Sequence, residues 1–308
     1  MPVSATHYLR PDVLSRISDL SFRARSVMAG FVSGIHRSPY QGQSVEFAQH
    51  REYVPGDDIR HLDWRVYGKT NRFYIKQFEE ETNLRCQILL DCSGSMRYPE
   101  HSAGSNRMTK FEYAATVAAC LAYLLIHQQD AVGLTLFDND VRTNIPPLSS
   151  LAHLRSLIGH MERARLEGPT ESNAMFRRIA AQLPARGVIV VVSDLLADVE
   201  DVLTGLRRFR EPDRDVIVMH VLDEDERVFP FQDNTLFEGL EHADLRAFAD
   251  PQSLRTAYLE AVNGFIARIR SACVNHRIDY VGLSTTDAID VALRSYLTAR
   301  AHLIKARA

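Results

Sequence analysis

The sequence predicts a doubly wound α/β domain with a mainly parallel sheet, preceded by a small appended domain that contains β segments. Two observations predict the large domain. From residue 86 onward the expected strands are short, almost wholly apolar runs, and helical patterns separate them. Such strands are buried on both faces, as in parallel sheets covered by helices. A third observation is that the first 85 residues lack this alternation. We therefore expect two domains, 1–85 and 86–308.

The elements of the large domain follow one another in a regular order. The expected strands are 86–91, 131–138, 141–146, 187–194, 215–223 and 278–285. The expected helices are 107–129, 151–164, 172–183, 199–210, 251–275 and a closing helix opened by Asp287. The third strand returns as a hairpin through the residues Asp138-Asn139-Asp140. Ligands of such sheets bind beyond the carboxyl ends of the strands, which makes those ends the first place to look for a site.

The appended domain has a different character. Residues 9–33 form a helical lead, with Pro11 near its start. Residues 34–85 are rich in glycine, polar and aromatic residues, which favours several β segments. Pro55-Gly56 fits the centre of a type II turn, because proline fixes φ and glycine accepts a positive φ.

Composition excludes several classes of protein. Hydrophobic residues make up 45% of the 308 residues and the net charge is −3, so no bulk attraction to nucleic acid or to an anionic membrane is expected. The four cysteines form no C-x-x-C pair, which favours a reducing compartment. The first residues lack the apolar core of a signal peptide, and no run reaches the roughly 18 apolar residues of a membrane span. We expect a cytoplasmic protein.

The stretch DCSGSM, residues 91–96, directly follows the first apolar strand. Asp91, Ser93 and Ser95 alternate, and in a strand-to-helix turn alternate residues can direct three oxygens at one point. Mg²⁺ prefers such oxygen ligands in an octahedral array. Thr170, after a Gly-Pro turn, and Asp194, at the end of another strand, are placed to add two more. The alternative is that these residues only cap helices, as Asp, Ser and Thr commonly do.

The pattern DCSGSM, then GPT, then VSDLLAD resembles the metal-ion-dependent adhesion site of von Willebrand factor A domains. The resemblance implies a metal site of Asp91, Ser93, Ser95, Thr170 and Asp194, filled by Mg²⁺ or alternatively by Mn²⁺ or Ca²⁺. It also implies a coordination position left open for a carboxylate of a partner protein. One departure is Leu195, which stands where glycine often follows the last aspartate of the motif.

Catalytic motifs are missing from the sequence. Ser93 lacks the first glycine of a G-x-S-x-G nucleophile elbow, and the chain contains neither a phosphate-binding P-loop nor an H-E-x-x-H zinc motif. A hydrolase would need a base beside a metal-bound water, and no such base is evident. We therefore expect a protein that is not an enzyme, with a metal-dependent hydrolase as the alternative.

Residues 36–81 carry a second signature, which resembles a bacterial family known as domain-of-unknown-function family fifty-eight. The matching residues are Gly34, His36, Ser38, Gly42, Glu46-Phe47, Arg51, Tyr53, Pro55 to Asp58, Arg60, Asp63-Trp64, Lys76 and Phe78 to Glu81. The downstream stretches VLDEDERVFPF, FEGLE, IDYVGLSTTD and LRSYLTAR also match.

That resemblance implies a von Willebrand A-like domain and a partner, a MoxR-type AAA+ ATPase. The implied role is that of an adaptor or co-chaperone that brings the ATPase to a protein client. A membrane-associated complex is compatible with this role, although the chain has no expected span of its own.

Two further hypotheses concern the same segment. Asp57, Asp58, Arg60, Asp63 and Arg65 lie beside Trp64 and Tyr67, which fits either a partner-facing surface or an internal salt-bridge network. Basic and aromatic residues also interleave, as in single-strand binders that stack bases; they are Arg60, Arg65, Lys69, Arg72 and Lys76 with Trp64, Tyr67, Phe73, Tyr74 and Phe78. The acidic residues among them and the net negative charge disfavour nucleic acid.

Overall fold

The computed structural model divides the chain into two compact units, residues 1–34 with 85–308 and residues 35–84. It describes residues 19–34, 46–52, 64–70, 72–79, 84–100, 107–168, 172–212, 214–241, 244–290, 292–294 and 296–297.

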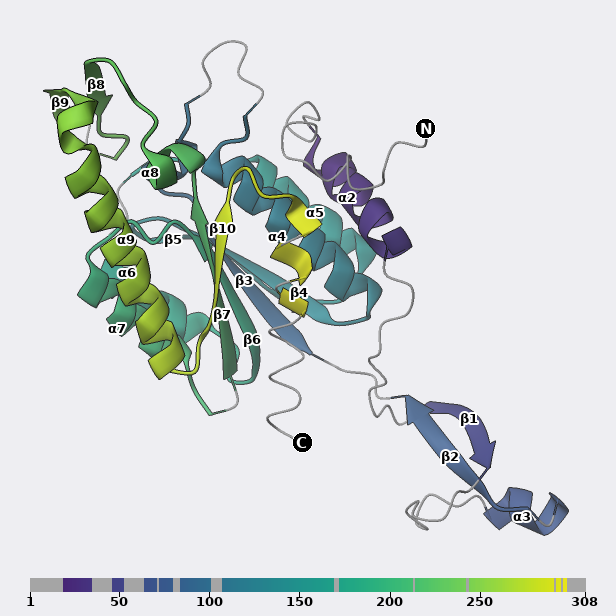
Figure 1. Cartoon of the computed structure of the whole chain (residues 1–308). Helices are drawn as coiled ribbons and strands as arrows, with labels where there is room; N and C mark the ends of the chain where they lie inside the picture. Colours follow the sequence, from purple (N-terminus) through teal and green to yellow (C-terminus); the bar gives the residue numbers. More distant parts are fainter. Residues whose placement is uncertain are drawn as a thin grey trace, which may run out of the picture. The chain divides into compact units, whose positions relative to one another are not determined.

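The larger unit is built on a six-stranded sheet with the order β10-β7-β6-β3-β4-β5 (Figure 1). The strands are β3 (Arg85–Asp91), β4 (Ala131–Phe137), β5 (Val141–Leu148), β6 (Gly187–Ser193), β7 (Arg214–Leu222) and β10 (Asp279–Ser284). Every neighbouring pair is parallel except β4 and β5, which form the expected antiparallel hairpin. The predicted α/β class with a mainly parallel sheet is confirmed.

Helices cover both faces of this sheet (Figure 1). On one face lie α4 (Lys110–His127) and α5 (Leu151–Glu162); on the other lie α6 (Ser172–Gln182), α7 (Val199–Phe209) and α9 (Pro251–Asn275). Alternate residues of the strands serve the two sides, as the two-residue period of a strand requires. Leu89, for example, belongs to the core cluster that α6, α7 and α9 complete.

The N-terminal helix α2 (Leu20–Gly34) packs on α4 and therefore belongs to the larger unit. The sequence had placed it in an appended domain of residues 1–85, and the structure differs from that expectation. The reason is a buried stripe at helical spacing, formed by Leu20, Ala24, Val27 and Met28. Arg23 is buried beside the stripe and donates a hydrogen bond from Nη1 to Thr116 Oγ1 at 3.1 Å.

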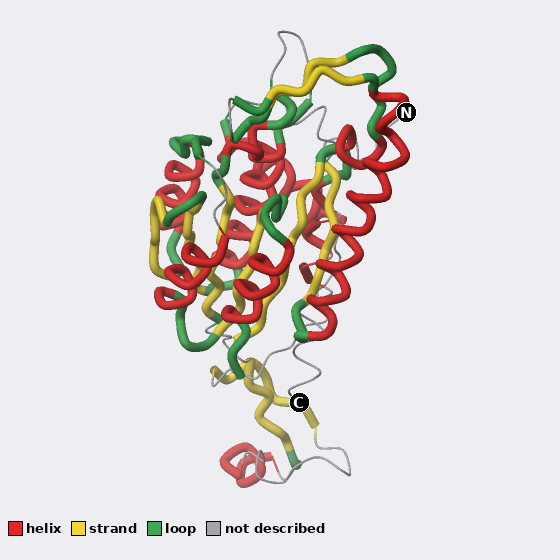
Figure 2. The backbone as a smooth tube through the Cα atoms, turned by 90° about the vertical axis from the view of Figure 1, so that its left-hand side faces the viewer, coloured by secondary structure: helices red, strands yellow, loops and turns green. Residues whose placement is uncertain are grey.

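Short elements missing from the sequence prediction surround the carboxyl ends of the strands. They are the 3₁₀ helix η3 (Gly94–Arg97), α8 (Glu224–Val228) and the hairpin of β8 (Thr235–Glu238) with β9 (Arg246–Ala249). The hairpin leads directly into α9 (Figure 2). A stack of aromatic rings, Phe229, Phe231, Phe237 and Tyr258, holds its inner side against α9.

The described part of the smaller unit consists of β1 (Glu46–Glu52), β2 (Tyr74–Glu79) and α3 (Trp64–Thr70). The two strands pair antiparallel. Trp64 is 64% exposed and meets Tyr67 edge-on, and Tyr67 stacks on Phe73 with ring centroids 4.5 Å apart. The expected network of Asp57, Asp58, Arg60 and Asp63 lies outside the described residues.

Candidate metal centre

Four aspartates stand in a row at the carboxyl ends of four neighbouring parallel strands. Asp223 follows β7, Asp194 follows β6, Asp91 ends β3 and Asp138 follows β4, so their order matches that of the strands in the sheet. All four side chains are buried. The sequence identified Asp91 and Asp194 as site residues, and the structure places both at this one edge. A buried carboxylate is costly unless it is paired or hydrogen-bonded, so the partners of each aspartate show what it does.

The loop after β3 directs the oxygens of Asp91, Ser93 and Ser95 to one place. Asp91 Oδ1 accepts a hydrogen bond from the Ser93 backbone N–H at 2.8 Å, and the hydroxyl oxygens of Ser93 and Ser95 are 3.0 Å apart. Ser93 stands at the N-cap position of η3, yet its side chain makes no capping hydrogen bond. The helix-cap alternative therefore does not account for this hydroxyl. Gly94 between them is needed for space, because a Cβ there would meet the Leu240 carbonyl oxygen at 2.7 Å.

Ser193, which the sequence analysis missed, completes the shell around Asp91. Its hydroxyl donates to Asp91 Oδ2 at 2.5 Å and accepts from the Leu195 backbone N–H at 2.8 Å. Leu195 adopts φ +54°, the left-handed region that favours glycine. This is the position where glycine often stands in the resembling motif, and here a leucine adopts that conformation with its side chain buried in the core.

Asp194 differs from Asp91 in having a cation beside it. Lys110, the first residue of α4, is 1% exposed, and its Nζ donates to Asp194 Oδ2 at 2.7 Å and to Glu226 Oε1 at 2.6 Å. Burial acts to raise the pKa of Asp194, but the Lys110 ammonium and the hydrogen bonds from the Ser95 hydroxyl and the Leu196 backbone N–H together hold that pKa below its usual range. No local sequence pattern indicated Lys110, because it lies 84 residues before Asp194 in the chain.

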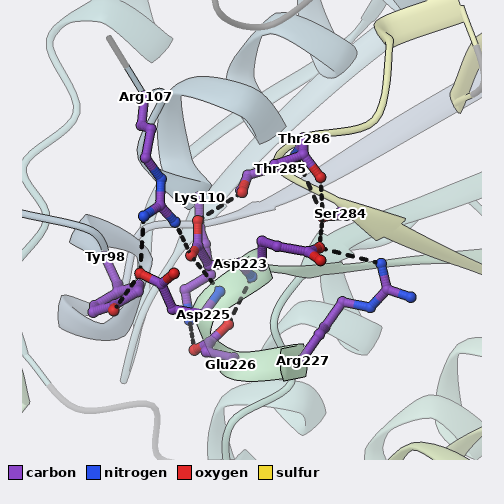
Figure 3. A network of polar contacts seen from close by, with 11 residues as sticks. Tyr98, Arg107, Lys110, Asp223, Asp225, Glu226, Arg227, Ser284, Thr285 and Thr286 are labelled. Atoms are coloured by element: carbon purple, nitrogen blue, oxygen red, sulfur yellow. Dashed lines mark hydrogen bonds and ion pairs between the residues drawn. The ribbon is translucent and has the colours of Figure 1, made fainter. Parts of the chain in front are cut away.

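The outer two aspartates also have fixed cations. Arg142 Nε donates to Asp138 Oδ2 at 2.7 Å. Arg107 forms an ion pair with Asp223, whose other oxygen accepts from Thr285 Oγ1 at 2.6 Å. Figure 3 shows this second group, in which Arg107 reaches both Asp223 and Asp225 while Tyr98 donates to Asp225.

Asp91 is the exception in the row. Among the described residues it forms no ion pair, and its hydrogen-bond donors are the Ser93 backbone N–H and the hydroxyls of Ser193 and Ser93. Burial, together with the negative charge of Asp194, raises the pKa of Asp91 to about 7. The site therefore concentrates negative charge at the one aspartate that no side-chain cation neutralises.

The gathered oxygens fit a hard divalent ion. Adjacent ligands of an octahedral Mg²⁺, each about 2.1 Å from the ion, lie about 3.0 Å apart, which is the separation of the Ser93 and Ser95 hydroxyls. The Asp91 carboxylate has about four lone-pair sites and accepts three hydrogen bonds, so acceptor capacity remains for an ion. No cluster of three His, Cys, Asp or Glu side chains occurs within the described ranges, so hydroxyl and water oxygens would have to complete the shell.

Thr170, the fifth predicted ligand, lies outside the described residues. Gly168, which is described, adjoins the site, since its carbonyl accepts a hydrogen bond from the Gly94 backbone N–H at 2.9 Å. The structure thus brings Asp91, Ser93, Ser95 and Asp194 together, and ligation of a metal by them stays a prediction.

A cavity of about 300 Å³ opens at this edge and reaches the site at Ser95. Ser95, Lys110 and Glu226 form polar parts of its wall. Leu196 and Leu245 also line it and are 53% and 62% exposed. The cavity therefore has polar walls with exposed leucines beside them, which is the reverse of the apolar core and polar rim of a typical protein interface.

Comparisons with known proteins find a family match but leave the chemistry open. The family described as "Protein of unknown function DUF58" matches residues 49–264. The uncharacterized proteins Rv1480 of Mycobacterium tuberculosis and Mb1516 of Mycobacterium bovis are each 22% identical over 258 residues, which are 82% of this chain and 78% of theirs.

Two solved structures are similar at lower identity. The conserved hypothetical protein BatB from Bacteroides thetaiotaomicron is 14% identical, with 70% of this chain and 98% of that chain covered and a TM-score of 0.47. The SpRpn10 VWA domain is 13% identical, with 68% and 93% covered and a TM-score of 0.40. In the described part of the chain, no helix has the length and apolar character needed to cross a membrane.

Proposed function

The chain belongs to the DUF58 family of proteins of unknown function, and from that premise we propose that it is a protein-interaction module whose interface includes a divalent metal ion. One observation carries the proposal. Of four buried aspartates at the strand ends, only Asp91 lacks a side-chain cation among the described residues. A divalent ion held there would neutralise this charge.

In this proposal Asp91, Ser93, Ser95 and Asp194 hold the ion, and Thr170 joins them from its neighbouring loop. Mg²⁺ is the preferred ion, because all the side-chain donors are oxygens; Mn²⁺ and Ca²⁺ are the alternatives. A bound ion would supply a positive coordination position to a carboxylate of a partner. The chain's own residues provide the remainder of the interface, with Leu196 and Leu245 offering apolar contact beside the cavity.

The proposed partners are a MoxR-type AAA+ ATPase and a protein client, with the chain acting as adaptor or co-chaperone. Support comes from the signature in residues 36–81, which continues in downstream stretches such as VLDEDERVFPF. The net charge of −3 favours a protein partner over nucleic acid. We propose the cytoplasm as the compartment, because all four cysteines are buried and none forms a disulfide.

The proposal is tested by capture of the full-length chain on the immobilised ATPase, with Mg²⁺ or with EDTA. We expect capture of the wild type in Mg²⁺ and its loss in EDTA. Asp91→Asn should not be captured in either condition, since it removes the unpaired carboxylate while keeping the size of the side chain.

A matched control is Asp140→Asn. Asp140 lies beyond the same edge of the sheet, and its carboxylate forms an ion pair with Arg178 at 2.8 Å. This variant should be captured like the wild type. Capture of the wild type in EDTA at the level seen in Mg²⁺, or capture of Asp91→Asn in Mg²⁺ at the wild-type level, would show that the metal centre is not part of the interface.

A further inference from the structure

Lys110 places a permanent cation inside the protein, beside the proposed metal centre. Its side chain is 1% exposed, and its ammonium bridges Asp194 and Glu226 at 2.7 and 2.6 Å (Figure 3 shows its contact with Glu226). A capping box between Thr109 and Glu112 fixes the start of α4, and so fixes where the lysine side chain begins.

Both acceptors of the ammonium are themselves held in place. Asp194 Oδ1 accepts from the Leu196 backbone N–H at 3.1 Å. Glu226 Oε2 accepts from the Asp223 backbone N–H at 2.8 Å within the capping box of α8. The ammonium is therefore confined between two anchored carboxylates, and it has little freedom to leave Asp194.

The same Asp194 carboxylate faces the proposed metal ligands. The Ser95 hydroxyl bonds to it, and the Ser93 and Ser95 hydroxyls are in turn 3.0 Å apart. A divalent ion at these oxygens and the Lys110 ammonium would share one carboxylate. Like charges repel strongly at such short range in the low dielectric of a protein interior.

We propose that Lys110 is a tethered counter-ion that sets the affinity of the centre for divalent cations and keeps it low. This inference rests on the proposed metal centre. The lysine offsets the charge of Asp194 when no metal is present, and it repels an ion that enters. The centre then holds its ion firmly only when a further carboxylate, supplied by the partner, joins the shell. Metal binding and partner binding are thereby made to depend on each other.

If Lys110 served only to stabilise the fold through its ion pairs, a different result would be expected. In either case, removal of Lys110 leaves Asp194 and Glu226 without their cation and lowers the stability of the metal-free protein. Only a counter-ion that opposes the metal gives tighter metal binding when it is removed. The direction of the change in Mg²⁺ affinity therefore separates the two roles.

The test is a calorimetric titration of the full-length chain with MgCl₂, comparing the wild type with Lys110→Met and Lys110→Gln. Methionine has a similar length without the charge, and glutamine keeps a donor for Asp194. We expect both variants to bind Mg²⁺ at least about tenfold more tightly than the wild type. Their midpoints of thermal unfolding in EDTA should be lower, and Mg²⁺ should raise them by more than it raises that of the wild type.

Arg107→Met is the matched control. It also removes a cation from a buried aspartate of the row, Asp223, but not from a predicted metal ligand. Its Mg²⁺ affinity should stay within about twofold of the wild type, because the charge removed does not touch Asp194.

The outcomes distinguish this inference from the proposal beneath it. If the wild type binds Mg²⁺ and the Lys110 variants bind it equally or more weakly, the counter-ion role is wrong and the metal centre stands. If neither the wild type nor any variant binds Mg²⁺, Mn²⁺ or Ca²⁺, the metal centre itself is wrong. Should both variants fail to fold, the Lys110 ammonium can be followed by NMR in the wild type. A signal that Mg²⁺ leaves unshifted would overturn the inference.

Discussion

Asp223 and Asp91 end two parallel strands of one sheet, and both are fully buried, yet their surroundings differ. Asp223 has Arg107, the Thr285 hydroxyl and the Asp225 backbone N–H, so its charge is balanced within the chain. Among the described residues, Asp91 receives the Ser93 backbone N–H and the hydroxyls of Ser193 and Ser93 but no cation, and it faces the negative charge of Asp194.

This contrast indicates that the two groups of residues at the sheet edge have different roles. The group around Asp223 joins η3, α8 and the β10 loop through satisfied contacts (Figure 3). It is suited to hold the edge together. The group around Asp91 retains negative charge that costs stability, which is common where a binding site needs an arrangement that folding alone would not select.

The largest change in the free energy of unfolding should come from removing the charge of Asp223, which is balanced within the chain. Asp223→Asn leaves Arg107 without its buried partner and weakens the cap of α8, and we expect a loss of about 3 kcal/mol in the free energy of unfolding. Urea denaturation in EDTA measures this loss, and Mg²⁺ should not restore it. A loss below about 1 kcal/mol would show that the ion pair contributes little to stability.

Substitution of Asp91 should raise the free energy of unfolding of the metal-free protein rather than lower it. Its pKa is raised to about 7 when folded, whereas an ordinary aspartate titrates near 4. The folded chain thus binds this proton more readily than the unfolded chain, and the stability contributed by Asp91 falls as pH rises from about 4 to 7. In EDTA at pH 8, Asp91→Asn should be more stable than the wild type, on the order of 2 kcal/mol, because the lost hydrogen bonds offset part of the gain.

The pH dependence sharpens this prediction. The difference between Asp91→Asn and the wild type should shrink as pH falls toward 5. Burial lowers the pKa of His220 to about 4, so His220 destabilises the fold as pH falls below about 6.5. That contribution is present in both proteins and cancels in the difference. A difference that is independent of pH, or an Asp91→Asn protein less stable than the wild type at pH 8, would contradict the account.

The smallest effect is expected from Ser95→Ala. A neutral hydroxyl attracts a cation less than a carboxylate does, so we expect Mg²⁺ affinity to fall by roughly threefold to tenfold while stability in EDTA changes by less than about 1 kcal/mol. Calorimetry and thermal unfolding measure the two quantities. If Ser95→Ala weakens Mg²⁺ binding as much as Asp91→Asn, the charge of Asp91 is not the main attraction.

Local pattern predicted much of this molecule. Apolar runs located five strands of the large sheet and the Asp138-Asn139-Asp140 turn indicated the sixth, β5. The two-residue spacing of Asp91, Ser93 and Ser95 placed three oxygens in one loop. Contacts between residues far apart in the sequence could not be predicted from local patterns. Lys110 meets Asp194 across 84 residues, and Ser193 meets Asp91 across 102.

Weak local signals explain the other omissions. Each strand of the β8–β9 hairpin has only four residues, which is too short for a periodicity to be read. The docking of α2 depended on a stripe visible in the sequence, but nothing local said which helix would cover it. Only two of the four aspartates in the row, Asp91 and Asp194, were predicted as site residues. Asp138 was interpreted as part of a turn and Asp223 as the end of a strand.

The most direct measurement is anomalous diffraction from crystals of the full-length chain grown with Mn²⁺. The account predicts a single strong peak bounded by Asp91, Ser93, Ser95 and Asp194, with the Thr170 hydroxyl in or next to the shell and Lys110 still on Glu226. A site without a peak at millimolar Mn²⁺, or a peak at Asp138 or Asp223 instead, would show that the unbalanced aspartate is not where a cation binds.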